Sequence, residues 1–252
     1  MKKLLIFFSV SLFLSVETSA QKIKYAVIVS ANMEWKAVKK FYPKENFEKS
    51  PWGEFFFKQI ENQQILFFHE GWGKVAAAGA TQYVIDHYKP EVLINLGTCG
   101  GFEGAIGRDE IVLANRTIIY DIKEAMGDSK EAIDDYTTGI DLSWLGTEYP
   151  ARVIKTTLVS ADQDLRPEEI ERLKSTYKAV AGDWESGSIA YTAQRNQVRL
   201  VILRGVTDLV NTKQGEAYGD FEFFTKRAEL VMFKLLEQLP DWIGLMKTRK
   251  IK

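Results

Sequence analysis

Apolar runs rich in β-branched residues alternate along the chain with segments of helical spacing. The run at residues 198–206 is the most strand-like, and Phe224, Ala228, Val231 and Leu235 recur at helical spacing near the end. Predicted strands cover residues 25–30, 55–60, 64–69, 91–96, 110–115, 152–159 and 198–206. Predicted helices cover residues 33–40, 73–88, 167–177, 186–196 and 221–239.

This alternation predicts the fold class. Strands that alternate with helices are typical of a largely parallel sheet covered by helices on both faces. We therefore predict an α/β fold, a single three-layer α/β/α domain with a mixed, mostly parallel central sheet. Residues 123–150 are polar and aromatic without clear periodicity. We interpret them as a lid.

The first twenty residues have the features of a signal peptide. A basic start at residues 1–3 precedes an uncharged apolar run at residues 4–16, and small residues lead up to Ala20. The alternative is a membrane anchor, but a spanning helix needs about 17–25 residues. No cysteine follows the run, so we expect no lipid anchor there. We predict cleavage before Gln21, export to the periplasm or medium without a stable membrane anchor, and a mature domain of residues 21–252.

Composition removes several classes of function. The formal net charge is −1, so nothing indicates a nucleic-acid partner. Cys99 is the only cysteine, which rules out an intrachain disulfide. His69 and His87 are the only histidines, so the sequence does not favour a histidine-rich zinc site or a Ser-His-Asp triad. No metal or organic cofactor is expected.

Three short motifs carry candidate chemistry. Residues 95–101 end a predicted strand in glycines, residues 203–208 end another in an acid, and residues 183–187 open a helical segment with two acids. Open α/β sheets bind ligands beyond the carboxyl ends of their strands. One fold can therefore bring a glycine-lined floor, a sugar-binding carboxylate and an acid together, which suggests an enzyme acting on a nucleoside.

These motifs resemble the nucleoside phosphorylase and nucleosidase superfamily, and most closely its 5′-methylthioadenosine/S-adenosylhomocysteine nucleosidases. The matching segments are Ser-Ala-Asn-Met-Glu at 30–34, Gly-Trp-Gly-Lys-Val-Ala-Ala-Ala at 71–78, Ile-Asn-Leu-Gly-Thr-Cys-Gly-Gly at 94–101, Asp-Trp-Glu at 183–185 and Arg-Gly-Val-Thr-Asp at 204–208. They follow the family's order and spacing. The resemblance implies an α/β fold, a homodimer, and cleavage of the N-glycosidic bond of purine nucleosides. In such a homodimer, residues 123–150 are a candidate to supply part of the neighbour's pocket.

By the same resemblance, Asp208 is the acid that protonates the leaving base, a contribution of about 10²–10⁴-fold. The alternative for Asp208 is a helix N-cap. Glu185 corresponds to the glutamate that accepts hydrogen bonds from the ribose hydroxyls, and its alternative is a first-turn acid favoured by the helix dipole. Asp183 is treated as structural. Trp184 stands where relatives place a methionine beneath sugar and base, with core packing as its alternative.

Further roles are implied around the expected water. Glu34 corresponds to the base that activates water, although it follows Ala31 by three residues where the family has four; a solvated first-turn Glu is the alternative. Arg204 corresponds to the arginine that helps hold the water and orient the acids, or else it forms a structural ion pair. Thr98 lies in the floor near water and ribose, and Gly100 allows the backbone to approach the substrate. Trp72 corresponds to the residue that contacts the 5′ substituent.

The base-binding segment departs from the family. Residues 160–165 resemble the segment that surrounds adenine, but the aromatic that stacks on the base falls at Asp164. Leu165 is still expected to offer backbone hydrogen bonds to the purine. Adenine is thus less firmly indicated than a purine, and bases from futalosine-like or deoxyadenosine substrates stay open.

The sequence favours water over phosphate as nucleophile. Phosphate-using relatives carry an Arg two residues before the floor Thr, where this chain has Leu96, and no Arg occurs at residues 30–36. A phosphorylase is the first alternative. The second is an exported nucleoside-binding protein without turnover, which the joint presence of Glu185, Arg204 and Asp208 argues against.

Overall fold

The computed structural model describes residues 22–249. The predicted signal peptide and its cleavage point before Gln21 lie outside this range, so both stay predictions. None of the helices between residues 22 and 249 has the combination of length and apolar character that crossing a bilayer requires.

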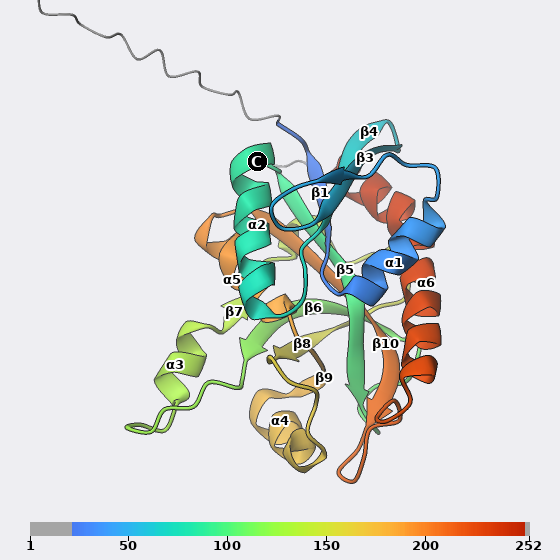
Figure 1. Cartoon of the computed structure of the whole chain (residues 1–252). Helices are drawn as coiled ribbons and strands as arrows, with labels where there is room; N and C mark the ends of the chain where they lie inside the picture. The colour runs from blue at the N-terminus through green and yellow to red at the C-terminus, as the bar shows by residue number, and fades with distance from the viewer. Residues whose placement is uncertain (1–21, 250–252) are drawn as a thin grey trace, which may run out of the picture.

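Ten strands in the described chain form one sheet, with six α-helices and two short 3₁₀ helices around it (Figure 1). The strands are β1 Tyr25–Val29, β2 Glu48–Lys49, β3 Glu54–Ile60, β4 Gln63–His69, β5 Val92–Phe102, β6 Ile111–Ile119, β7 Thr138–Gly139, β8 Ile154–Ser160, β9 Ala179–Asp183 and β10 Arg199–Val210. The helices are α1 Asn32–Phe41, α2 Lys74–Tyr88, α3 Lys130–Asp135, η1 Ser143–Leu145, η2 Pro167–Glu169, α4 Ile170–Tyr177, α5 Ser186–Arg195 and α6 Phe221–Thr248.

The sheet is mixed, and part of it closes on itself. Parallel pairings link β4, β1, β5 and β10, and a second parallel group links β6, β8 and β9. Antiparallel pairings of β10 with β6 and of β5 with β9 join the two groups, so that β5, β10, β6, β8 and β9 form a ring. The predicted fold class is confirmed.

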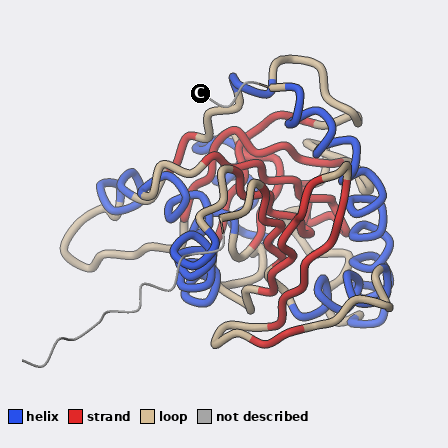
Figure 2. Tube along the Cα trace, turned by 90° about the horizontal axis from the view of Figure 1, so that it is seen from above, coloured by secondary structure: helices blue, strands red, loops and turns tan. Residues whose placement is uncertain are grey.

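The two faces of the sheet are covered by different helices, with the strands gathered in the middle of the molecule (Figure 2). Alternate residues of β1 point to opposite sides, as strand geometry requires. Val27 and Val29 pack in one apolar cluster with α1 and α6, while Ala26 and Ile28 pack in a second with α2 and α5. These clusters make the three layers, and they cover both faces of β1 and of β10.

Several predicted boundaries were wrong. The strand predicted at 91–96 runs on as β5 through the glycine stretch to Phe102, and the strand predicted to end at 206 runs on as β10 to Val210. β9 was not predicted at all. The last helix was expected to end at residue 239, but α6 continues past Pro240 because Trp242, Ile243 and Met246 extend its buried face.

Candidate active site

A cavity of about 720 Å³ lies beyond the carboxyl ends of β1 and β9, over the glycine stretch of β5. Its volume falls in the range of small-molecule sites, about 300–1,000 Å³. Eight of the nine predicted site residues line it: Glu34, Trp72, Thr98, Gly100, Leu165, Trp184, Glu185 and Asp208. The ninth, Arg204, is fully buried behind them.

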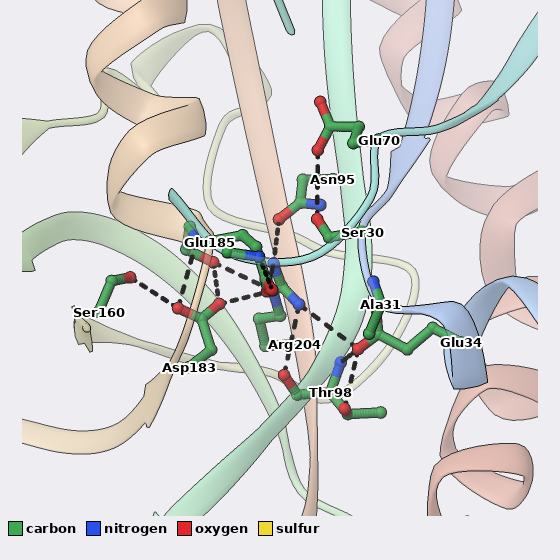
Figure 3. Close-up of polar contacts among 12 residues, drawn as sticks. Ser30, Ala31, Glu34, Glu70, Asn95, Thr98, Ser160, Asp183, Glu185 and Arg204 are labelled. Carbon is green, nitrogen blue, oxygen red and sulfur yellow. Dashed lines mark hydrogen bonds and ion pairs between the residues drawn. The ribbon is translucent and has the colours of Figure 1, made fainter. Parts of the chain in front are cut away.

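Arg204 is the centre of a buried charge cluster (Figure 3). Its Nε lies 2.8 Å from Oδ2 of Asp183, its Nη1 lies 3.5 Å from Oε1 of Glu34, and its Nη2 lies 3.8 Å from Oε2 of Glu185. Nη2 also donates to Oδ1 of Asn95 at 2.9 Å. One guanidinium therefore faces three carboxylates, an arrangement in which the planar fork of Arg fixes several acceptors at once.

Gly97 makes room for this guanidinium. A Cβ atom at position 97 would lie 2.0 Å from Nη1 of Arg204 and 2.9 Å from Oε1 of Glu34. The glycine is therefore required by close packing inside a strand, since β5 continues through it.

Asp183 ties this cluster to the start of α5. Its Oδ1 accepts from the Ser160 hydroxyl at 2.6 Å and from the Ser186 amide at 3.2 Å, and its Oδ2 accepts from the Ser186 hydroxyl. Three hydrogen bonds and the contact with Nε of Arg204 thus hold the Asp183 carboxylate in place, as a structural role requires.

Glu34 points into the cavity from the first turn of α1. Its Oε1 accepts from the Thr98 amide at 2.6 Å and the Thr98 hydroxyl at 2.8 Å, and its Oε2 accepts from the Ala31 amide at 3.2 Å. The side chain is only 2 % exposed, so the alternative of a solvated surface Glu is excluded. The three-residue spacing from Ala31 does not keep Glu34 out of the site.

Glu185 lies at the N-cap position of α5 and is almost fully buried. Its Oε1 accepts a hydrogen bond from the Gly73 amide at 3.2 Å. Burial raises the pKa of Glu185, and the neighbouring Arg204 opposes that rise.

Two tryptophans form one wall of the cavity. The rings of Trp72 and Trp184 lie 4.9 Å apart and are tilted by 37°. Trp72 is 61 % exposed, so most of its ring is available to a ligand or to another chain. Trp184 lines the cavity and is only partly buried, so core packing does not account for its position.

Asp208 lies inside β10, two residues before its end. Its Oδ1 accepts from the Thr207 hydroxyl at 2.6 Å, and the residue is 5 % exposed. Burial raises the pKa of Asp208 and the charges of Glu216 and Asp164 add to this, whereas the Thr207 hydrogen bond acts against it. The N-cap alternative was wrong, because α6 begins at Phe221 and Asp220 caps it by accepting from the Phe223 amide.

Leu165 differs from the expectation. Its carbonyl accepts a hydrogen bond from the Tyr218 hydroxyl, so one backbone group expected to face the base already has a protein partner. The Leu165 side chain packs on the floor instead: a Cβ atom at Gly100 would lie 2.9 Å from Cδ1 of Leu165.

Other cavity residues were missed by sequence reasoning. Tyr218, Phe221 and Phe224 line the cavity from the segment between β10 and the first turn of α6. Residues 218–224, which begin ten residues after the predicted acid, contain four aromatics, and this was a signal that could have been followed. Glu70 and Asn95 stand behind the site as buried polar residues. Asn95 lies within the matching segment 94–101, and Glu70 directly precedes the matching segment 71–78, so both could have been singled out.

The charged residues among the described lining are all acidic. Among the described residues, Glu34, Asp164, Asp183, Glu185 and Asp208 line the cavity, and no Lys, Arg or His does. The segment 123–150 contributes no lining residue within the described chain either, so the predicted lid does not cover this chain's own cavity. No group of His, Cys, Asp and Glu suited to holding a metal ion occurs within residues 22–249.

A mixed α/β sheet with a carboxylate-lined cavity at its strand ends is the arrangement expected of the nucleoside phosphorylase and nucleosidase class. The chain belongs to the family described as the phosphorylase superfamily, whose sequence profile matches residues 24–239. The predicted resemblance is confirmed.

Among its relatives is the 5′-methylthioadenosine/S-adenosylhomocysteine nucleosidase of Desulfotalea psychrophila, 27% identical over 201 residues that cover 75% of this chain and 86% of the relative. The fold is similar to a mutant of the Helicobacter pylori nucleosidase with 5′-methylthioadenosine in its active site, at a TM-score of 0.71, 20% identity, and coverage of 88% of this chain and 99% of the other. It is equally similar to the futalosine hydrolase of Helicobacter pylori, at a TM-score of 0.71, 20% identity, and coverage of 87% and 98%.

Proposed function

We propose that this protein is a purine nucleosidase, an N-glycosyl hydrolase that releases the base from adenosine-type nucleosides such as 5′-methylthioadenosine or S-adenosylhomocysteine. The observation that carries the proposal is the cavity in which buried Asp208 and the Arg204-centred carboxylates Glu34 and Glu185 converge. The names of the relatives support the same reaction class.

In this mechanism Asp208 acts on the leaving base. Its raised pKa keeps a proton on the carboxyl to a higher pH than is usual for Asp. The proton passes to the purine nitrogen N7 while the C1′–N9 bond breaks and its electron pair moves to the base. A neutral base then leaves in place of an anion.

The remaining charge develops on the sugar and the water. Glu185 accepts hydrogen bonds from the ribose hydroxyls, which strengthen as C1′ becomes cationic. Water adds to C1′ and gives its proton to Glu34, which Thr98 and Arg204 hold in position. Arg204 thus acts through the acids it orients, and the products are the free base and a ribosyl product with a 1′-hydroxyl.

The acidic lining of the cavity favours water over phosphate as the nucleophile. A phosphate dianion needs cationic donors, and among the described lining residues only acids carry charge. Leu96, at the position where phosphate-using relatives carry Arg, is fully buried in an apolar cluster. The alternatives are a phosphorylase and a binding protein without turnover, and the experiment below distinguishes both from a nucleosidase.

The test is base release from 5′-methylthioadenosine, S-adenosylhomocysteine, adenosine and inosine, followed by chromatography with and without phosphate. Phosphate-independent release that disappears in Asp208→Asn is the expected result. Release only with phosphate, together with ribose 1-phosphate, would make the protein a phosphorylase. Nucleoside binding without release would make it a binding protein.

Two further properties belong to this proposal. The exported protein should begin at Gln21, and an intact Met1 in material recovered outside the cytoplasm would contradict signal cleavage.

A homodimer is proposed from the family resemblance, and the exposed Trp72 and Phe221 at the cavity are consistent with cover by a second chain. Light scattering of the mature protein decides between monomer and dimer.

A further inference from the structure

The loop of residues 71–73 lies between β4 and α2, and it contacts Glu185 and Trp184, the two residues expected to face the sugar. The Gly73 amide donates to Oε1 of Glu185 at 3.2 Å, and the Trp72 ring lies 4.9 Å from that of Trp184. Gly71 and Gly73 both have φ of +86°, a conformation that favours glycine. The loop therefore has a defined shape, and its position sets the hydrogen-bond partner of Glu185.

A polar cluster of Lys74, Asp121 and Asp162, here called the Lys74 clasp, holds this loop from behind. The Lys74 Nζ lies 2.5 and 2.6 Å from the two carboxylate oxygens of Asp121. The Lys74 amide donates to Oδ1 of Asp162 at 2.8 Å, and the Asp162 amide donates to Oδ2 of Asp121 at 3.0 Å. The clasp thus joins the start of α2 to the segments that follow β6 and β8.

Glu185 and Asp162 of the clasp accept hydrogen bonds at the same helix end, the start of α2. The first amides of a helix have no partner within it and need acceptors from elsewhere. At the start of α2, Glu185 takes the Gly73 amide and Asp162 takes the next one, that of Lys74. Because these donors belong to neighbouring residues, a shift of the clasp must move the hydrogen bond to Glu185.

We propose that Lys74 and Asp121 are positioning residues for ribose recognition: they hold loop 71–73 so that Glu185 is aligned with the sugar hydroxyls. The inference rests on the proposed function, because it assumes that Glu185 binds ribose. Neither residue lines the cavity, so both act through the loop and not on the substrate.

The experiment compares Lys74→Met and Asp121→Asn with Lys74→Arg as the rescue variant. The control is Lys58→Met, which removes a comparable pair: Lys58 and Glu45 are 28% and 23% exposed, against 22% and 16% for Lys74 and Asp121. The first readout is the ratio of kcat/KM for adenosine to that for 2′-deoxyadenosine. The second is hydrogen exchange of the peptides that contain residues 71–78 and 184–190, which requires no activity.

We expect both clasp variants to reduce the ribose preference by about tenfold, as small displacements of positioning groups do, and to speed exchange in the two peptides. Lys74→Arg should recover much of the preference, and Lys58→Met should change neither readout. An unchanged preference, or exchange no faster than in Lys58→Met, overturns the inference. If wild-type protein releases no base, the proposed function fails by itself, and faster exchange in the clasp variants still decides whether the clasp positions loop 71–73.

Discussion

The Nη1 atom of Arg204, on β10, lies 3.5 Å from Oε1 of Glu34, on the first turn of α1. The same guanidinium contacts Asp183 and lies 3.8 Å from Glu185. A charge cluster whose members are all buried therefore links the proposed base to the proposed ribose ligand. Loss of the cation should disturb both the fold and the chemistry.

Replacing Arg204 with Met should destabilise the protein by about 3–5 kcal/mol, because three buried carboxylates lose their common counter-ion. Urea unfolding measures the change. Arg172→Met serves as the control, since the Arg172–Glu169 pair is partly exposed and should contribute less than about 1 kcal/mol. Equal effects of the two substitutions would contradict a central role for Arg204.

Asp208→Asn should lower kcat by about 10²–10⁴-fold with little change in stability, since the shape is kept and only the transferable proton is lost. The pH profile provides a second check. The acid must be protonated, so wild-type activity should fall as pH rises through the raised pKa of Asp208. That alkaline decline should be absent from the residual activity of Asp208→Asn, and its persistence would assign the titration to another group.

Glu70 should make the protein less stable as pH rises. It is fully buried, accepts from the Ser30 hydroxyl at 3.2 Å and the Thr81 hydroxyl at 2.6 Å, and burial raises its pKa from 4.5 to about 8. Between these values the folded protein holds a proton that the unfolded chain has released, so the unfolding free energy falls as pH increases.

The difference between wild type and Glu70→Gln isolates this contribution. The difference in unfolding free energy between the two proteins should change by roughly 4 kcal/mol between pH 4.5 and 8, an order of magnitude taken from the pKa shift of Glu70. Denaturant unfolding at several pH values measures it. Parallel pH dependences of the two proteins would mean that Glu70 is ionised in the folded state.

Gly97→Ala should destabilise by about 1–3 kcal/mol and lower activity, because its methyl group would overlap Arg204 and Glu34. Gly244→Ala offers a contrast in α6, where a Cβ atom would meet nothing within 4 Å. There the substitution should stabilise by about 0.5–1 kcal/mol. Thermal unfolding of both variants should therefore shift in opposite directions.

Trp72→Ala should shift selectivity toward nucleosides with a large 5′ substituent. The exposed Trp72 ring forms part of the cavity wall and narrows the cavity there, so its removal opens space without disturbing the core. We expect the ratio of kcat/KM for S-adenosylhomocysteine to that for 5′-methylthioadenosine to rise. Trp52→Ala, at a partly exposed tryptophan outside the cavity lining, is the control, and equal ratios in both variants would remove Trp72 from the 5′ pocket.

Local patterns in the sequence were sufficient for seven of the ten strands, for five of the six α-helices and for the three-layer class, because each apolar face has to be buried against another element. They were also sufficient to mark Glu34, Glu185 and Asp208, since motifs of the family stand at those positions. Where local signals conflicted, the prediction failed. Glycines inside β5 and Pro240 inside α6 suggested ends, yet long-range burial carried both elements further.

Only the tertiary structure decided how these residues meet. The parallel register of β5 with β10 sets Arg204 opposite Gly97, and the packing of α1 turns Glu34 inward despite its shortened spacing. The contact of Tyr218 with Leu165 and the clasp around Lys74 likewise join segments far apart in the chain. The physical reason is that such contacts depend on strand register and sheet closure, which no single segment encodes.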